Sequence, residues 1–168
     1  MAHRKASFAA LTLALALPLL TACGFHLRGP QSLPFKTIYV GSPNSELSAA
    51  LRRSIRTSGS TEVVDEPKEA EAVLTIVSEA KQKRILSLNA EGRVREFELR
   101  YTFAFRVNAK DGREIVPQNQ ILLTRDFSFN DSAVLAKEQE EALLYRDMQN
   151  DLVQQIMRRM AAANKVDL

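Results

Sequence analysis

The feature that most constrains the fold is a long alternation of apolar and polar residues that ends at Val107. Its apolar positions are Phe97, Leu99, Tyr101, Phe103, Phe105 and Val107. The positions between them are mostly charged or polar and include Glu96, Glu98, Arg100, Thr102 and Arg106. Successive side chains of a strand point to opposite faces, so Arg93–Val107 predicts a long strand with one face on a core. The other face meets water or a polar partner.

Three further segments have the composition of strands. Phe35–Val40 is rich in β-forming residues and stops at a Gly-Ser-Pro sequence. Ala72–Leu86 follows an acidic loop through Glu66-Pro67, and Gln120–Phe129 follows a turn at Lys110–Arg113. The apolar face of the last segment also contains an arginine at position 125. This side chain either reaches past a sheet edge to water or pairs with a carboxylate.

Two segments have helical periodicity. Asn44 or Ser45 can cap a helix that ends at Ser58-Gly59, and its buried stripe is Leu47, Leu51 and Ile55. A longer helix is predicted from Ser132 to about Ala162. Its stripe is Leu144, Met148, Leu152, Ile156 and Met160. The polar face of this helix mixes acidic and basic residues, whereas a helix on a membrane surface favours Lys and Arg, so we assign the stripe to the sheet.

The predicted order is strand, helix, three strands, helix. This order gives an α+β fold, a two-layer sandwich in which two helices cover one face of a four-stranded, mostly antiparallel sheet. The first strand, the first helix and the second strand are expected to form a parallel crossover unit.

A basic leader and an apolar run open the chain. The run Phe8–Leu20 has 13 residues, and Leu20-Thr21-Ala22-Cys23 closes it. This order is typical of a secretory signal, and the run is shorter than the about 20 residues that span a bilayer as a helix. Because the tetrapeptide resembles a bacterial lipobox, we expect residues 1–22 to be a lipoprotein signal peptide. Cys23 would then carry a diacylglycerol and an N-acyl chain, with no other cofactor.

The alternative is a free thiol after a conventional signal. It has no structural rationale, because Cys23 is the sole cysteine of the chain and has no partner for a disulfide. Residues 23–34 are expected to form an irregular tether, and residues 35–168 a single domain. Loss of residues 1–22 lowers the formal net charge from +3 to about +1. This small excess argues against a nucleic-acid binder, whose basic residues should be numerous and clustered.

The domain lacks the residues of the common catalytic devices. After loss of residues 1–22 the one remaining histidine is His26, next to the proposed anchor. Nucleophilic catalysis by serine or cysteine needs a histidine or a thiol inside the fold. No His/Cys cluster has the spacing of metal ligands, and the glycines form no phosphate-binding loop. We therefore expect a protein that binds and not an enzyme.

The hairpin between the second and third strands is the best candidate binding site. A register that pairs Lys83 with Glu96 would align apolar residues with each other and opposite charges with each other. It would also set Arg84 opposite Arg95, with Arg93 close by, and like charges in direct opposition are unfavourable unless an anion lies between them. We hypothesise that these three arginines bind a phosphate-bearing ligand through paired hydrogen bonds. The alternative, in which they splay into solvent or meet a glutamate of the turn, stays open.

Two motifs resemble one known family. Cys23-Gly24-Phe25-His26-Leu27-Arg28 is similar to the start of the mature LPS-assembly lipoproteins, the LptE or rare lipoprotein B family. Those proteins begin with a lipidated cysteine, a glycine, an aromatic residue and His-Leu-Arg. Leu135-Ala136-Lys137-Glu138 resembles the family's Ala-Leu-Ala-Lys-acid pattern at the start of the last helix. The predicted order of elements also matches the family's two-helix, four-stranded sandwich.

The resemblance implies a non-enzymatic outer-membrane lipoprotein. It implies a plug inside the LptD β-barrel, in a one-to-one complex that inserts lipopolysaccharide (LPS) into the outer leaflet, and Gly24 is consistent with export to that membrane. Lys137 matches a family lysine implicated in LPS binding. The family's partner arginine precedes the glycine of the turn between the second and third strands. Asn89-Ala90-Glu91-Gly92 has no arginine there, and Arg93 is the candidate substitute.

Two other classes of protein share part of this pattern. An accessory lipoprotein of another envelope machine, such as a pilotin or a barrel-assembly subunit, would share the lipobox. It should lack the Gly-Phe-His-Leu-Arg start and the long paired strands. A lipid-anchored hydrolase would need the histidine or thiol that this domain does not supply.

Overall fold

The computed structural model describes residues 32–41 and 45–163. The predicted signal peptide, Cys23 and the tether up to residue 31 lie outside the described residues, so what is expected of them stays a prediction. The described strands are β1 (Thr37–Val40), β2 (Glu62–Val64), β3 (Ala72–Leu88), β4 (Val94–Ala109) and β5 (Glu114–Ser128). The described α-helices are α2 (Glu46–Ser58) and α3 (Val134–Ala162), and two single turns of 3-10 helix, η2 (Pro67–Glu69) and η3 (Asp131–Ala133), complete the order.

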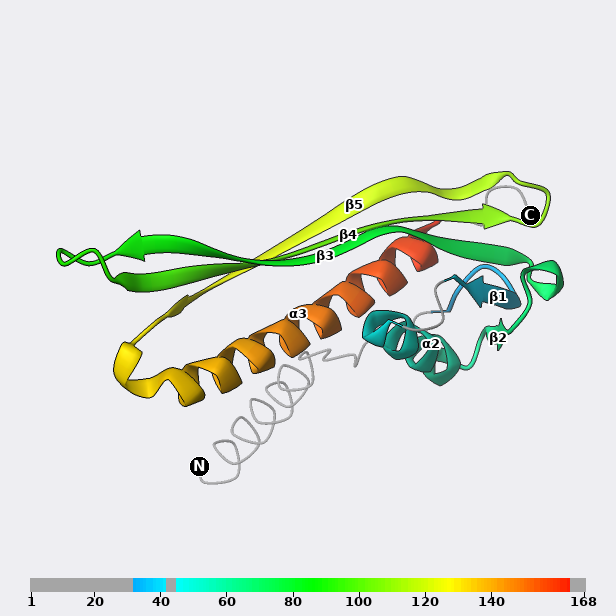
Figure 1. Cartoon of the computed structure of the whole chain (residues 1–168). Coiled ribbons are helices and arrows are strands. Elements are labelled where there is room, and N and C mark those ends of the chain that lie inside the picture. Colours follow the sequence, from blue (N-terminus) through cyan, green and yellow to red (C-terminus); the bar gives the residue numbers. More distant parts are fainter. Residues whose placement is uncertain (1–31, 42–44, 164–168) are drawn as a thin grey trace, which may run out of the picture.

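The strands form one sheet in the order β2-β1-β3-β4-β5. β1 runs parallel to β2 and to β3, and β3, β4 and β5 are antiparallel (Figure 1). The predicted α+β class is therefore confirmed. The predicted count of four strands is wrong, because Glu62–Val64 adds a fifth at one edge. Three residues are too few to leave a periodic pattern, and β2 pairs with β1 alone.

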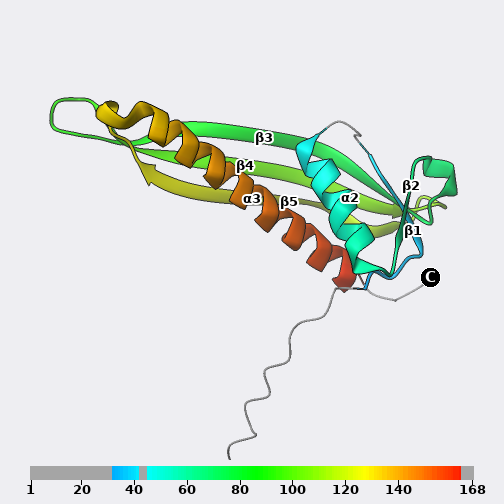
Figure 2. The ribbon, with the colours of Figure 1, turned by 90° about the horizontal axis from the view of Figure 1, so that it is seen from below.

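Both helices cover the same face of the sheet, which Figure 2 views from the helix side. The stripe of α3 is confirmed as its buried face, because Met148, Leu152, Ile156 and Met160 are fully buried. They join one core cluster with the apolar face of β4, where Leu99, Tyr101, Phe103, Phe105 and Val107 are also fully buried. Burial of this much apolar side chain is the dominant stabilising contribution to a chain without a disulfide.

Local signals define α2. The side chain of Ser45 accepts a 3.0 Å hydrogen bond from the backbone N–H of Ser48, which satisfies one of the free donors of the first turn. The helix ends at Gly59, whose φ of 70° lies in the left-handed region that glycine adopts without a steric penalty. Both ends and the buried stripe of this helix agree with the prediction.

β5 starts earlier than predicted. The strand begins at Glu114, and Val116 is buried opposite Val107 although Pro117 follows it. A proline is tolerated here because β5 is an edge strand, so no neighbour needs its missing N–H. Further along β5, Arg125 pairs with Asp151 of α3 at 2.5 Å, which confirms the carboxylate-paired alternative.

Candidate functional site

The candidate site is one end of the molecule, which we call the distal end. It comprises the β3–β4 turn (Asn89–Arg93), the last residues of β5 and the first turns of α3, and these lie at the same end of the sheet in both views (Figures 1 and 2). The turn closes through Asn89, whose side-chain oxygen accepts from the backbone N–H groups of Glu91 and Arg93. Gly92 has a φ of 77°, which explains a glycine at this position.

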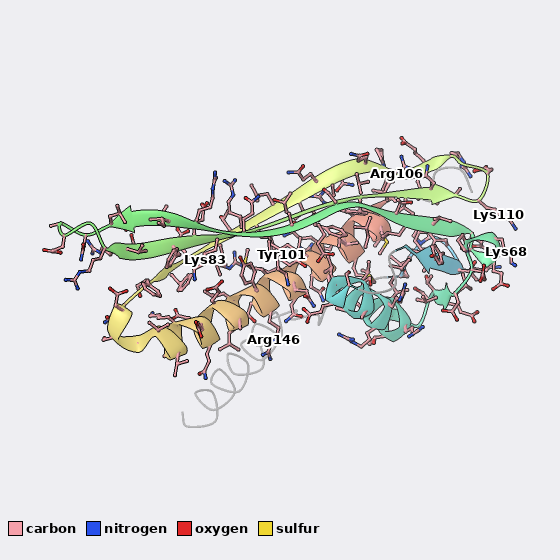
Figure 3. The ribbon with its side chains drawn as sticks, in the orientation of Figure 1. Lys68, Lys83, Tyr101, Arg106, Lys110 and Arg146 are labelled. Carbon is pink, nitrogen blue, oxygen red and sulfur yellow. The ribbon has the colours of Figure 1, made fainter. Side chains whose placement is uncertain are left out.

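A small aromatic cluster supports the distal end on the helix side of the sheet. Phe97 packs edge-on against Phe129, with ring centroids 5.1 Å apart, and stacks on Phe127 at 5.8 Å. Lys83 places its ammonium group 4.3 Å from the centre of the Phe97 ring and 2.6 Å from a carboxylate oxygen of Glu141 in α3. Figure 3 labels Lys83 where it lies between the sheet and α3. This lysine therefore joins the sheet to the helix through a cation–π contact and an ion pair.

Lys137 lies where the first turns of α3 approach the end of β5. Its Nζ lies 2.7 Å from a carboxylate oxygen of Glu140 and donates to the hydroxyl of Ser128 at 3.2 Å. The side chain is 18% exposed, so the ammonium group is fixed by its neighbours yet remains open to a ligand. Ser128 pairs with Glu96, which brings this lysine close to the turn of the β3–β4 hairpin.

Most of the large apolar side chains that are exposed to solvent in the described residues lie at the distal end. Leu135 is 77% exposed and Ile85 58%. The other members of this set near the distal end are Leu86, Leu88, Val134 and Leu143. Exposed apolar side chains and cations therefore occur at the same end of the molecule, a combination suited to an amphipathic anion, and exposed apolar patches commonly mark interaction sites.

The register predicted for the hairpin is wrong. Lys83 pairs with Leu99 and not with Glu96, and Arg84 lies opposite Glu98 and not opposite Arg95. The predicted alignment is already offset by two residues at the start of β3, where Leu74 pairs with Val107, and the shift between Ile76 and Ser78 adds a third. The opposed arginines that motivated an anion at the tip are therefore absent from the described hairpin.

The structure brings some of the predicted site residues together and separates one. Arg93 lies in the turn, and the carbonyl of Arg95 accepts from the backbone N–H of Phe129 at 2.8 Å, so both belong to the distal end with Lys137. Arg84 is adjacent in sequence to Lys83 and so points to the opposite, helix-free face. Sequence reasoning missed Lys83, although a lysine in the apolar register of β3 was a visible signal.

The helix-free face of the sheet carries mixed charge. Glu98 of β4 lies between Arg84 of β3 and Asp126 of β5 in the sheet, and Arg100 approaches Glu98 at 3.7 Å. No helix covers this face in the described residues (Figure 1). It can therefore meet water or a polar partner, as the alternation along β4 predicts.

A polar cluster lies nearer the middle of the sheet. The hydroxyl of Tyr101 donates to Glu79 at 2.5 Å, and burial, followed by this hydrogen bond, raises the pKa of Tyr101 far above its usual value. Lys81 lies 5.0 Å from the centre of the Tyr101 ring and 5.6 Å from that of Tyr145. Burial, followed by the charge of Glu141, also raises the pKa of Tyr145. Both tyrosines are therefore neutral donors at ordinary pH.

The described residues contain neither a metal-binding cluster nor a membrane-spanning helix. Residues 32–41 and 45–163 contain no group of three or more His, Cys, Asp or Glu side chains placed to bind a metal ion. Within the same ranges, no helix combines the length and the apolar character that crossing a bilayer requires.

Comparisons with known proteins agree with this geometry. The profile of the lipopolysaccharide-assembly family, LptE, matches residues 35–160. An LPS-assembly lipoprotein LptE of Pectobacterium atrosepticum is 29% identical over 158 residues, which cover 92% of this chain and 85% of the relative. Another of Yersinia enterocolitica is 28% identical over 166 residues, covering 94% of this chain and 77% of the relative.

Two solved structures share the fold. The solution structure of an uncharacterized lipoprotein B of Nitrosomonas europaea superposes with a TM-score of 0.73 at 42% identity and covers 83% of this chain and 91% of its own. The crystal structure of the rare lipoprotein B of Shewanella oneidensis gives a TM-score of 0.65 at 25% identity. The match covers 75% of this chain and 92% of the other.

Proposed function

Since this chain belongs to the lipopolysaccharide-assembly family LptE, we propose that it is an outer-membrane lipoprotein that forms a one-to-one plug complex with the LptD β-barrel. It is held at the membrane by the acyl chains on Cys23 and assists insertion of LPS at the cell surface. It acts by binding and does not catalyse a reaction, in keeping with the lack of a histidine or a thiol in the predicted domain.

The observation that carries the LPS-binding part of this proposal is the composition of the distal end. LPS is an anionic lipid with several acyl chains, so a contact surface for it needs cations next to exposed apolar groups. Lys137, Arg93 and Arg95 supply the cations, and Leu135 and Ile85 belong to the exposed apolar set at the same end of the molecule. Ammonium and guanidinium groups bind phosphate oxygens through charge-assisted hydrogen bonds.

Arg84 has a different place in the proposal. It lies on the helix-free face, where it is the register partner of Glu98 on the neighbouring strand. The lumen of a large membrane barrel is generally polar, so a mixed-charge face such as this one suits contact with the inner wall of LptD.

Copurification tests the partner directly. The full chain, expressed with its native signal and a C-terminal tag, is recovered from detergent-solubilised outer membranes. We expect a stable one-to-one complex with LptD, and a Cys23→Ser variant should lose its outer-membrane location. Recovery of the protein alone, or with the subunits of another envelope machine, would contradict the plug.

A further inference from the structure

One edge of the sheet is left without a partner strand along most of its length. β1 pairs with β3 only at Ala72, Val73 and Leu74. From Thr75 to Leu88 the other side of β3 has no neighbour in the described sheet, and its residues from Ser78 onward are almost all exposed. A long edge of this kind presents free backbone donors and acceptors, and it can accept a further strand.

A groove lies beside this edge, which we call the α2–α3 groove. It has a volume of about 620 Å³, and its lining comes from α2 (Glu46, Ala49, Arg53), β3 (Lys81) and α3 (Ala142, Tyr145, Arg146, Gln149). Lys81 belongs both to the groove and to the open stretch of β3. Figure 3 shows Arg146 on the side of α3 away from the sheet.

The charges of the α2–α3 groove are not balanced from within. Arg53 and Arg146 come from different helices, and neither side chain makes a hydrogen bond or an ion pair within residues 32–41 and 45–163. Lys81 has one carboxylate neighbour, Glu46, at 3.9 Å, and that carboxylate is itself mostly in water. Three cations therefore share one hollow with a single weakly held anion. A negatively charged occupant would remove their mutual repulsion.

Lys81 is held ready for such an occupant. Its ammonium group lies over the rings of Tyr101 and Tyr145, and the hydroxyl of Tyr145 is itself fixed by a 3.0 Å hydrogen bond to the carbonyl of Gln82. Because these contacts already restrict the lysine, little side-chain entropy remains to be lost on binding.

We propose that the α2–α3 groove and the adjoining open edge of β3 together bind an acidic, extended polypeptide segment of a partner protein. The edge selects a polypeptide over a phosphate, because a backbone alone can satisfy a row of N–H and C=O groups. The cations select acidic side chains. A second copy of this chain fits poorly, since antiparallel pairing of two such edges would bring Lys81 and Lys83 of each copy together. The proposal goes beyond LPS binding at the distal end and does not depend on it.

Binding of synthetic peptides to the full chain in non-ionic detergent tests the proposal. The probe is a fluorescent peptide of about ten residues that alternates Glu and Thr, the length of a long strand. A second peptide of the same sequence carries N-methyl groups on all its backbone amides, which keeps the charge but removes the hydrogen-bond donors from both edges of the strand. Fluorescence anisotropy gives the affinities, and hydrogen exchange reports the amides of residues 78–88.

We expect the unmodified peptide to bind, to bind more weakly as salt rises, and to slow exchange in residues 78–88. The double variant Arg53→Gln/Arg146→Gln should lower the affinity about tenfold or more, because it removes two charge-assisted contacts. The matched control is Arg56→Gln/Arg158→Gln, which removes the same charge from exposed positions of the same helices outside the groove. It should change the affinity by less than about twofold.

Four results would overturn the proposal. Equal binding of the methylated and the unmodified peptide would show an anion site without strand addition. Displacement of the peptide by inorganic phosphate, at a concentration that supplies the same amount of negative charge as the peptide, would also show an anion site without strand addition. Protection of residues 78–88 that grows with protein concentration and without peptide would identify a second copy as the occupant. Absence of peptide binding would remove the site.

Discussion

Removal of the charge at Lys137 is the change that most sharply tests LPS binding at the distal end. In the unliganded protein its ammonium group lies 2.7 Å from Glu140, three residues further along the same helix. To bind a phosphate, the lysine has to exchange this carboxylate for the ligand. Release from a helical pair of this kind costs about 0.2–0.5 kcal/mol, whereas a hydrogen bond to a charged group contributes about 1.5–3 kcal/mol.

The difference gives the size of the effect. A net contribution of about 1–2.8 kcal/mol corresponds to a change in Kd of about 5- to 100-fold, because 1.4 kcal/mol is a factor of ten. Lys137→Gln should therefore weaken LPS binding by this factor. Its free energy of unfolding should change by less than about 0.5 kcal/mol, since Glu140, the carboxylate left without its partner, is 45% exposed to water.

The glutamates of the same turn provide the matched control. Glu140→Gln removes the carboxylate that competes for Lys137 and should lower the Kd for LPS about twofold. Glu138→Gln makes the same charge change one residue beyond Lys137. Within the described residues this carboxylate forms no ion pair, so the change in the Kd for LPS should be smaller. The assay is a titration of surface-immobilised LPS with the full chain in non-ionic detergent. An unchanged Kd for Lys137→Gln, or equal effects of the two glutamate variants, would refute the reasoning.

Three further predictions concern the fold. Leu152→Ala should lower the free energy of unfolding by about 2–5 kcal/mol, because it leaves a cavity at a fully buried position. The control, Gln154→Ala at an exposed position of the same helix, should change it by less than about 0.5 kcal/mol. Equal midpoints of the two variants in chemical denaturation would mean that α3 does not pack on the sheet. Ser45→Ala should cost about 1 kcal/mol through loss of the cap of α2, and an unchanged denaturation midpoint would argue against this cap. The raised pKa of Tyr101 means that the unfolded chain releases this proton first, so the contribution of this group to stability should be constant below about pH 10 and should be lost as the pH rises further. Tyr101→Phe should reduce that alkaline loss, and an identical pH profile would contradict the assignment.

Sequence periodicity was sufficient for the elements that carry long, regular patterns. The alternation along β4 and the fourth-residue stripe of α3 predict their buried faces, because each side chain meets the core in a fixed order along the element. The cap at Ser45 and the stop at Gly59 are local chemistry, so they too could be read from the sequence.

The features that the sequence did not reveal depend on contacts between distant segments. β2 is a strand only because β1 lies beside it, and three residues carry no period. The hairpin register depends on bulges near Ile76 and the tip, and one extra residue in a strand moves the pairing of every residue beyond it.

The candidate site was predicted in part. Lys137 came from the resemblance to the LptE family, whose membership the family profile supports, and the structure places it beside Ser128. Arg84 was grouped with the tip on the basis of a wrong register. Lys83 and the exposed apolar set were missed, since their grouping exists only where β3 and the start of α3 meet at the distal end.

The central claim is that LPS contacts the distal end of this chain during its assembly. The most direct measurement is photocrosslinking in cells with a photoreactive amino acid placed at Leu135, the most exposed apolar residue of the distal end, and at Gln154, an exposed residue further along α3. We predict that irradiation yields an LPS adduct at position 135 and none at position 154. Equal adducts at both positions, or an adduct at 154 alone, would contradict the account.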